Sequence, residues 1–455
     1  MDKNLKITRR KVVLNALFSL FLATALSAQV TVKPEPREGF EERIRKALSS
    51  MPVVDTHEHL ASISSLSKSK TLDFMWLFHQ YADDDIKAAG MSKPQFARLM
   101  SDSLTVSEKW EILQPFYEAS FNTAYNRVTL LSVDHLFGVK EFNEKTVHLL
   151  TDKLREVYQT DWYHTVLRDK CNIQFVINDS KPIPGNPDFF RYTTRFDYFQ
   201  LDSRAKIEQL GKEHGTAISA LNDLNATLRK HFENEVKSGL TTIKNSSAYY
   251  RSLYYEDVSR ERAEEVFRKV MASGETPLDP DAAKPLADYM MHRVLDLARE
   301  FKKPVQIHTG LQAGDGNYIM NSNPALLANL FLKYRDVKFV LFHGGYPYGG
   351  EFGSLAKNFR NVYIDLCWLY IISPSYSERY LHEWLETVPA NKILAFGGDY
   401  ENVENVYGHL LFAKEIIGNV LTEKVKSRYL TEEEALKIAR MILHDNAIKL
   451  FDLKY

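Results

Sequence analysis

The sequence predicts a single (β/α)8 barrel, a TIM barrel, with a large helical insertion after the first strand. Eight short apolar runs are separated mostly by amphipathic helical segments. Four of these runs end in histidine or aspartate, and a long stretch after the first run carries no strand pattern. Alternation of short apolar runs with helical segments is typical of parallel strands joined by crossover helices.

The composition is that of a soluble globular protein with a substantial core, since 44% of the 455 residues are hydrophobic and 26% are charged. The length alone would allow two or three domains, but α/β barrels routinely exceed the average domain size. We therefore expect one domain over residues 51–455. The formal net charge of -1 gives no global field that would attract nucleic acid or an anionic membrane, and the expected partner is a small-molecule substrate.

The N-terminal residues predict an export signal. Basic residues between Lys3 and Lys11 precede an apolar run from Val12 to Ala25, and small residues follow through Ala28. The run is shorter than the roughly 20 residues that a membrane-spanning helix needs, so we expect cleavage and no stable membrane span afterwards. Residues 1–28 are thus expected to be a signal peptide of a periplasmic or secreted protein, and 29–50 a linker and lead-in helix. Arg9-Arg10 leaves Sec and twin-arginine export both open.

The predicted strands are spread along the whole chain, and the third of them is the weakest. They are Pro52–Asp55, Ile173–Ile177, a stretch within Phe189–Phe199, Thr241–Lys244, Val305–His308, Phe339–His343, Val362–Leu366 and Ile393–Phe396. Helical patterns precede the fifth and sixth strands at residues 284–301 and 324–334, and a closing helix is expected over 432–450. The connection over about residues 60–165 is predicted to be a helical insertion that covers the mouth of the barrel. Its aromatic residues would suit a homo-oligomer interface as well as a lid.

Two histidines at the end of the first strand are the first candidate metal ligands. Side chains two residues apart on a strand point to the same side, so His57 and His59 can bind one ion. The pair alone is a weak signal. Its position strengthens it, because the carboxyl ends of barrel strands carry the active site.

His308, His343 and Asp399 end three later strands in the same way. Taken singly, a hydrogen-bonded histidine or a capping aspartate is the better interpretation of each. Together they predict a divalent metal held by His57, His59, His308 and Asp399. Imidazole nitrogens with one carboxylate suit Zn2+, Mn2+, Fe2+ or Co2+, and Zn2+ is the leading expectation. With only Cys171 and Cys367 present, neither a four-cysteine zinc site nor a disulfide scaffold is expected.

The ordered motifs resemble those of the amidohydrolase superfamily, in its amidohydrolase-related (family 2) branch. That branch includes uronate isomerases and barrel domains fused to glutamine synthetase. The resemblance spans residues 51–455, and the long insertion is also similar to that of uronate isomerases. It rests on DTHEH at 55–59, IHTG around His308, HGGYP around His343, GGDY around Asp399 and the closing HDNAIKLF. This set of motifs is specific for the superfamily but does not identify a substrate.

The resemblance implies roles for the site residues. Asp399 would both contact the metal and move protons, since a bound divalent ion lowers the pKa of water to about 7. His343 would polarise the substrate carbonyl or orient the nucleophile. Lys244 stands where some family members carry a carboxylated lysine that bridges two metals. We expect instead that Lys244, with Arg251, binds a substrate carboxylate, and a structural salt bridge remains an equal alternative.

The function expected first is hydrolysis of an amide, ester or lactone bond in a small carboxylated molecule by metal-activated water. Isomerisation of a sugar acid, as in uronate isomerases, or a metal-dependent decarboxylation would use the same site. A periplasmic binding protein without chemistry is disfavoured, because every expected ligand position is occupied. A glycosidase would instead place paired acidic residues at its strand ends.

Overall fold

The computed structural model describes residues 39–181, 188–196, 198–314 and 316–454. The predicted signal peptide, residues 1–28, and the following residues 29–38 lie outside the described residues. From Phe40 onward the chain forms one unit. It begins with helix α1 (Phe40–Ser50), whose Ile44 and Leu48 are buried.

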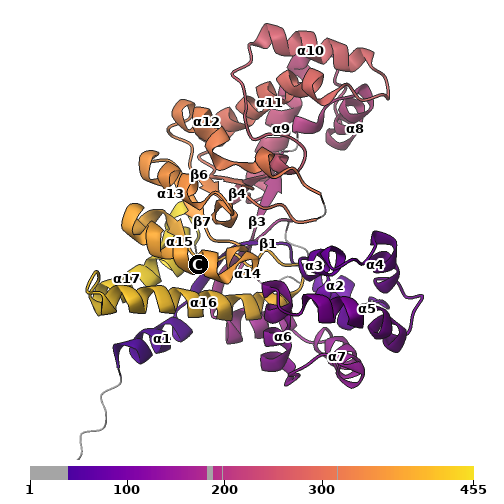
Figure 1. Cartoon of the computed structure of the whole chain (residues 1–455). Helices are drawn as coiled ribbons and strands as arrows, with labels where there is room; N and C mark the ends of the chain where they lie inside the picture. The colour runs from indigo at the N-terminus through magenta and orange to yellow at the C-terminus, as the bar shows by residue number, and fades with distance from the viewer. Residues whose placement is uncertain (1–38, 182–187, 197, 315, 455) are drawn as a thin grey trace, which may run out of the picture. The chain divides into compact units, whose positions relative to one another are not determined.

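Eight parallel strands pair in chain order and confirm the predicted barrel (Figure 1). They are β1 (Val53–Glu58), β2 (Ile173–Asn178), β3 (Phe190–Arg195), β4 (Thr242–Asn245), β5 (Val305–Ile307), β6 (Phe339–Leu341), β7 (Val362–Asp365) and β8 (Ile393–Leu394). Hydrogen bonds from the segment after β8 join it to β1. The main-chain N–H of Thr56 donates to Phe396 O (3.1 Å), and that of Asp399 donates to His57 O (2.9 Å).

The eighth strand is shorter than predicted. The N–H of Ala395 donates to Ile442 O at 2.8 Å and is thereby removed from the strand ladder. The predicted closing helix is likewise divided into α17 (Glu432–Arg440), the π-helical segment η9 (Met441–Asp445) and α18 (Asn446–Phe451). The amide of Asn446 donates to Ile393 O (2.8 Å) and Ala390 O (2.7 Å), so the closing segment is tied to the start of β8.

The described chain between β1 and β2 is helical and contains no strand. Its elements are α2 (Ile63–Leu66), η1 (Phe74–Phe78), α3 (Ala82–Ala88), α4 (Lys93–Leu99), α5 (Val106–Ser120), α6 (Ala124–Phe137), α7 (Glu144–Val157) and η2 (His164–Lys170). In α7, Val147, Leu150 and Leu154 recur at helical spacing and are buried, while Asn143 caps the first turn.

Further helices follow the other strands. After β3 come η3 (Tyr198–Gln200), α8 (Arg204–His214) and α9 (Leu221–Lys237); after β4, η4 (Ser247–Tyr249), α10 (Arg260–Ala272) and α11 (Pro280–Glu300). After β5 come η5 (Ile319–Ser322), η6 (Pro324–Leu327) and α12 (Ala328–Lys333); after β6, η7 (His343–Gly345) and α13 (Gly349–Asn358). After β7 come α14 (Leu369–Ile372), α15 (Pro374–Thr387) and η8 (Ala390–Lys392); after β8, α16 (Val403–Lys426).

The longest of the described helices, α16, packs against helices from distant parts of the sequence. It packs against α6 of the first connection, against α1 and against α15. Fifteen of its residues are buried, as expected for a helix with neighbours on several sides. No helix within the described residues is both long and apolar enough to cross a membrane.

Candidate active site

Side chains at the carboxyl ends of the strands line a cavity of about 250 Å³. They belong to His59, Gln80, Tyr81, Arg195, Lys244, Ser246, Tyr249, Tyr250, His308, Ala313 and Asp399. We call this the metal cavity. Parallel strands place their carboxyl ends at one end of the barrel, so residues far apart in the sequence meet here.

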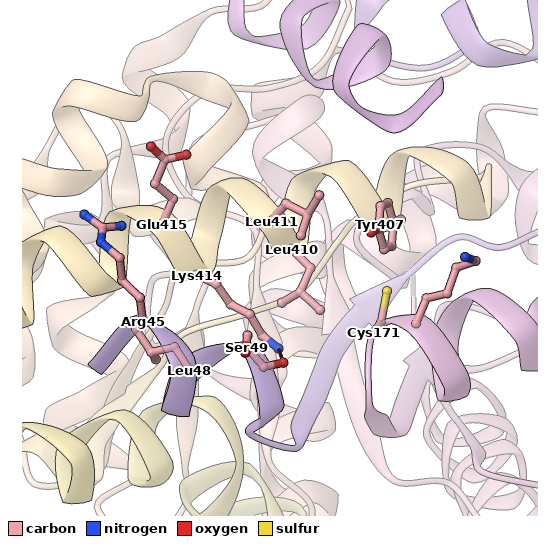
Figure 2. Close-up of a pocket in the computed structure, with 10 residues that line it drawn as sticks. Arg45, Leu48, Ser49, Cys171, Tyr407, Leu410, Leu411, Lys414 and Glu415 are labelled. Carbon is pink, nitrogen blue, oxygen red and sulfur yellow. Dashed lines mark hydrogen bonds between the residues drawn. The ribbon is translucent and has the colours of Figure 1, made fainter. Parts of the chain in front are cut away.

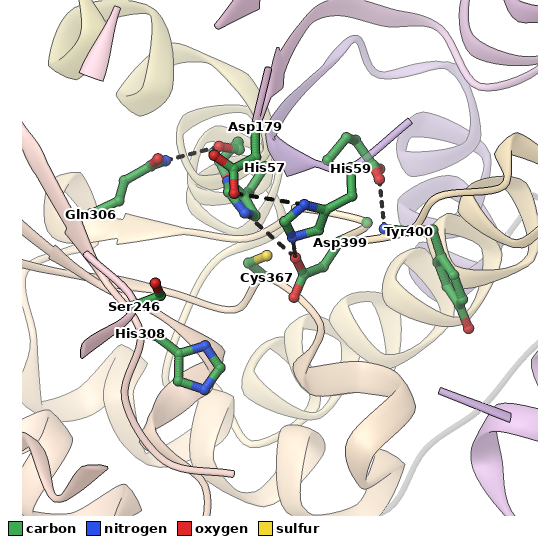
Figure 3. Close-up of polar contacts among 12 residues, drawn as sticks. His57, His59, Asp179, Ser246, Gln306, His308, Cys367, Asp399 and Tyr400 are labelled. Carbon is green, nitrogen blue, oxygen red and sulfur yellow. Dashed lines mark hydrogen bonds and ion pairs between the residues drawn. The ribbon is translucent and has the colours of Figure 1, made fainter. Parts of the chain in front are cut away.

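His57, His59 and Asp399 lie close together, as Figure 3 shows, and the latter two line this cavity. His57 Nε2 lies 3.6 Å and His59 Nε2 lies 3.1 Å from Asp399 Oδ1. Ligand atoms at 2.0–2.1 Å from a tetrahedral Zn2+ are about 3.3 Å apart, so these separations suit a common ion. Asp399 adopts φ 63°, and the bond from its N–H to His57 O fixes this strained residue beside β1.

His57 supplies the test of whether the site fits a metal. Its side chain is completely buried, yet neither ring nitrogen has a hydrogen-bond partner among the described residues. An unsatisfied buried polar atom costs about 1–3 kcal/mol, and a cation at Nε2 would remove part of that cost. The burial of His57 lowers its pKa well below the ordinary value, and the nearby Lys244 charge adds to this. A neutral imidazole is the form that binds a metal, so the residues present fit one.

Asp399 remains ionised despite its burial. Burial alone would raise its pKa, but the hydrogen bond from His59 and the electrostatic interactions with the neighbouring histidines outweigh it and hold the pKa well below the ordinary value. The carboxylate is therefore available as a ligand and as a proton acceptor.

His308 lines the metal cavity from the end of β5, and His343, at the end of β6, contacts it. His308 Nδ1 lies 2.9 Å from His343 Nε2. The remaining nitrogens donate to main-chain oxygens, His308 Nε2 to Leu311 O (2.8 Å) and His343 Nδ1 to Cys367 O (3.0 Å). Burial lowers the pKa of His343 to about 4 and that of His308 well below its ordinary value.

Two further groups near the metal cavity are a carboxylate that sequence reasoning missed and a thiol. Asp179 follows β2, and its Oδ2 lies 3.6 Å from His59 Nδ1, so His57, His59 and Asp179 form a second ligand-like group. Cys367 lies close to His343 and Asp399. Burial raises the pKa of the Cys367 thiol, which therefore stays protonated and is a poor ligand.

Two buried carboxyl groups hold the Asp399 segment against β1. Asp55 Oδ1 accepts hydrogen bonds from the N–H groups of Gly398 (3.2 Å) and His57 (3.3 Å), while Glu58 Oε2 accepts one from Tyr400 N (2.7 Å). A Cβ atom at position 398 would overlap the Glu58 carboxylate, which explains the glycine there. Burial raises the pKa of Asp55 to about 6 and that of Glu58 well above its ordinary value.

Lys244, for which the sequence predicts substrate binding, lines the metal cavity and is 3% exposed. Its Nζ lies 3.8 Å from the centre of the Phe342 ring, a cation–π contact. Among the described residues it forms no ion pair, and burial lowers its pKa to about 8. It therefore remains mostly charged at pH 7 and can receive an anion.

Arg251 does not line the metal cavity. Its guanidinium pairs with the buried Asp288 (2.5 Å), donates to Tyr254 O (2.8 Å) and stacks over the Tyr255 ring. This geometry is the structural salt bridge that the sequence left as the alternative. The second cation of the cavity is instead Arg195, at the end of β3, whose Nε donates to Asp179 Oδ2 (2.9 Å). The weak third strand was the only sequence signal for it.

Comparison with known proteins agrees with the motifs. Residues 257–453 match the amidohydrolase family model. Protein fluG of Emericella nidulans is 32% identical over 204 residues, which are 44% of this chain and 24% of that protein. The chain thus spans less than a quarter of the length of this relative.

Solved structures share the fold over nearly the whole chain. A uronate isomerase from Thermotoga maritima has a TM-score of 0.77 at 18% identity, covering 90% of this chain and 97% of that one. Glucuronate isomerase from Caulobacter crescentus has a TM-score of 0.74 at 16% identity, covering 91% and 94%. A protein named as a metal-dependent hydrolase, from Lactobacillus casei, has a TM-score of 0.63 at 20% identity, covering 90% and 97%. The match at residues 257–453 confirms the predicted resemblance to amidohydrolases, and the solved structures show that the fold is shared.

Proposed function

We propose that this protein is a metal-dependent hydrolase that cleaves an amide, ester or lactone bond in a small carboxylated organic substrate. The observation that carries the proposal is the convergence of His59 and Asp399 on His57, whose two buried ring nitrogens have no hydrogen-bond partner in the described part of the chain. A metal cation in a cavity that also holds the cationic side chains of Lys244 and Arg195 suits attack on a carbonyl group next to a carboxylate.

His57, His59 and Asp399 would hold the metal, with His308 as the fourth predicted ligand and Zn2+ as the proposed ion. When bound, such an ion supplies Lewis acidity, which makes water a stronger acid and polarises a carbonyl oxygen. Mn2+ and Fe2+ suit the same nitrogen and oxygen donors.

The side chains of the cavity divide the remaining tasks. Asp399 accepts the proton of the attacking water and returns it to the leaving group, for which its ionised state and its position suit it. His343, fixed by its bond to Cys367 O, orients the reacting groups. Lys244 and Arg195 bind the substrate carboxylate, the latter taking the place predicted for Arg251. A cavity of about 250 Å³ admits only a small group beside the metal.

Isomerisation of a sugar acid is the second candidate. It is favoured by the fold that this chain shares with the uronate isomerase of Thermotoga maritima. A decarboxylase would use the same residues. Proton NMR of the reaction distinguishes the three, because isomerisation conserves mass, decarboxylation releases CO2 and hydrolysis gives two products.

The test of the proposed function begins with metal analysis of the purified protein and of a His57→Ala/His59→Ala double variant. We expect about one equivalent of a transition metal, lost in the variant. Asp399→Asn, fully loaded with metal, should lose at least about 100-fold in kcat, the range for a lost proton-transfer residue. Full activity in loaded Asp399→Asn would contradict the proposal.

We also propose that the protein is exported, on the basis of the basic and apolar residues that precede Ala28. Fractionation of cells that express the full chain, with N-terminal sequencing of the product, should find a shortened protein outside the cytoplasm. An uncleaved cytoplasmic product would exclude this.

A further inference from the structure

Two further cavities adjoin the metal cavity and share lining residues with it. A cavity of about 560 Å³, here called the outer cavity, shares Arg195 with the metal cavity. A third cavity, of about 410 Å³, shares Tyr250 with the metal cavity and shares Gln200 and Lys206 with the outer cavity. The three are therefore neighbours around the carboxyl ends of β3 and β4.

The outer cavity has an aromatic wall. The rings of the lining residues His214 and His231 lie 4.3 Å apart, and the ring of Tyr198, which also lines the cavity, lies 6.3 Å from His231. Burial lowers the pKa of His231 to about 4, so this ring is neutral at pH 7. A neutral wall of flat rings favours a flat, largely apolar occupant.

The rest of the outer cavity fits the same kind of occupant. Leu201 and Leu210 contribute aliphatic surface, while polar and charged groups come from Gln200, Lys206, Gln209 and Glu213. Its volume lies in the range of about 300–1,000 Å³ that is usual for small-molecule sites, whereas the metal cavity is below that range. The metal cavity alone therefore holds only part of a molecule of ordinary ligand size.

Arg195 marks the boundary between the two cavities. Its guanidinium is held by Asp179 (2.9 Å) and contacts Ser246 Oγ (3.4 Å), so it is fixed by groups on the metal side. A substrate whose carboxylate pairs with Arg195 inside the metal cavity can extend past Arg195 into the outer cavity.

We propose that the outer cavity binds the leaving part of a two-part substrate, an aromatic alcohol or amine joined to a small carboxylated acyl group. This inference rests on the proposed function. Water adds to the acyl carbon, the carbon–oxygen or carbon–nitrogen bond breaks, and the alcohol or amine leaves with a proton that originates from the water. The acid product remains beside Lys244, and the aromatic product occupies the outer cavity.

The test fills the outer cavity without disturbing the metal cavity. Ala205, in the first turn of α8, is exposed and lines only the outer cavity, so Ala205→Trp inserts a ring there. The matched control is Leu411→Trp. It fills a cavity of about 290 Å³ lined by Arg45, Cys171 and Lys414, none of which lines the metal cavity (Figure 2).

Two monoesters of succinic acid, the 2-naphthyl and the methyl ester, carry the same acyl group and differ only in the leaving part. For Ala205→Trp we expect kcat/KM for the naphthyl ester to fall by at least about tenfold and that for the methyl ester to stay within about twofold. Leu411→Trp should change neither. An equal loss for both esters would overturn the assignment.

Calorimetric binding of 2-naphthol to the metal-loaded protein separates the inference from the proposed function. Binding by the wild-type protein and by Leu411→Trp, with loss in Ala205→Trp, supports the outer cavity as an aromatic site. Absence of binding, or unchanged binding in Ala205→Trp, overturns the inference. If wild-type protein binds naphthol but hydrolyses neither ester, the proposed hydrolysis of such esters fails while the aromatic site stands.

Discussion

His343 Nε2 lies 2.9 Å from His308 Nδ1, while the other nitrogen of each ring faces a main-chain carbonyl oxygen. A neutral imidazole has a single N–H, and in both rings this N–H is donated to the main-chain carbonyl oxygen. The two nitrogens that face each other are then both acceptors. Two lone pairs at this distance repel unless a cation lies beside them, and burial disfavours a protonated imidazole.

We therefore predict that His308 binds the metal and that its contact with His343 is then broken. His308→Gln should weaken Zn2+ binding by on the order of 10–100-fold or more, the loss typical when a metal site is disturbed. The apparent Kd is measured by competition with a chromophoric chelator. His148→Gln is the matched control, because His148 is half-exposed on α7. Equal Kd values for both variants would show that His308 is not a ligand.

Zn2+ should also stabilise the folded protein through these residues. A ligand at 100 times its Kd adds about 2.7 kcal/mol to the free energy of unfolding. The Tm measured with Zn2+ should therefore exceed that measured with chelator in the wild-type protein. The difference should disappear in the His57→Ala/His59→Ala variant, and its persistence there would place the metal elsewhere.

The two arginines near β3 and β4 should respond in opposite ways. Arg251→Met leaves the buried Asp288 with Lys284 as its remaining cationic partner, and we expect destabilisation of up to about 3 kcal/mol with unchanged KM. Arg195→Met removes a cation from the metal cavity and should raise KM by about tenfold, as expected for a lost charged hydrogen bond.

Urea unfolding and steady-state kinetics on both variants check this contrast. Arg251→Met/Asp288→Asn should regain much of the lost stability, because no unpaired charge remains buried. A higher KM in Arg251→Met at normal stability would restore the sequence-based assignment of substrate binding.

Much of the fold could be predicted because the strands are short, apolar and followed by polar residues. The third strand was weak because four of the six residues in FRYTTR have polar side chains, and Arg195 was missed with it. The sequence left the role of Arg251 open between substrate binding and a salt bridge for a different reason. Sequence position put it after β4, but its partner Asp288 lies on α11, and no local pattern reveals a pairing across 37 residues.

The sequence could predict that the candidate metal ligands lie near one another, whereas it could not predict their individual contacts. The histidines at positions 57 and 59 share a side because strand geometry dictates it. Asp179 sits beside His59 only because β2 pairs with β1 in a particular register, with Glu58 opposite Asn178. Register depends on the whole barrel, so a one-strand pattern cannot supply it.

Glu404 makes stability depend on pH. It is fully buried on α16, accepts hydrogen bonds from Trp162 (2.8 Å) and Tyr158 (3.1 Å), and burial raises its pKa to about 7. The unfolded chain releases this proton near pH 4.5, before the folded one does. Stability from this group is thus full below about pH 4.5 and is lost as pH rises to about 7, by up to about 3 kcal/mol.

Glu404→Gln keeps a neutral acceptor at this position and should remove that loss. The free energy of unfolding of the variant, relative to wild type, should rise between pH 5 and pH 8. Glu383→Gln, at an exposed position on α15, should show a constant difference over the same range. A constant difference for Glu404→Gln as well would mean that Glu404 is ionised in the folded protein at pH 5.

The chemical state of Lys244 distinguishes a site with one metal from a site with two. Its pKa of about 8 leaves it mostly protonated at pH 7, which favours a role as a cation for a substrate carboxylate over a carboxylated bridging ligand. Lys244→Met should therefore keep one equivalent of metal and raise KM by about 10–100-fold for a carboxylated ester, with little change for its neutral methyl-diester analogue. If the wild-type protein instead binds two equivalents of metal and Lys244→Met binds one, Lys244 is a carboxylated lysine that bridges two metals.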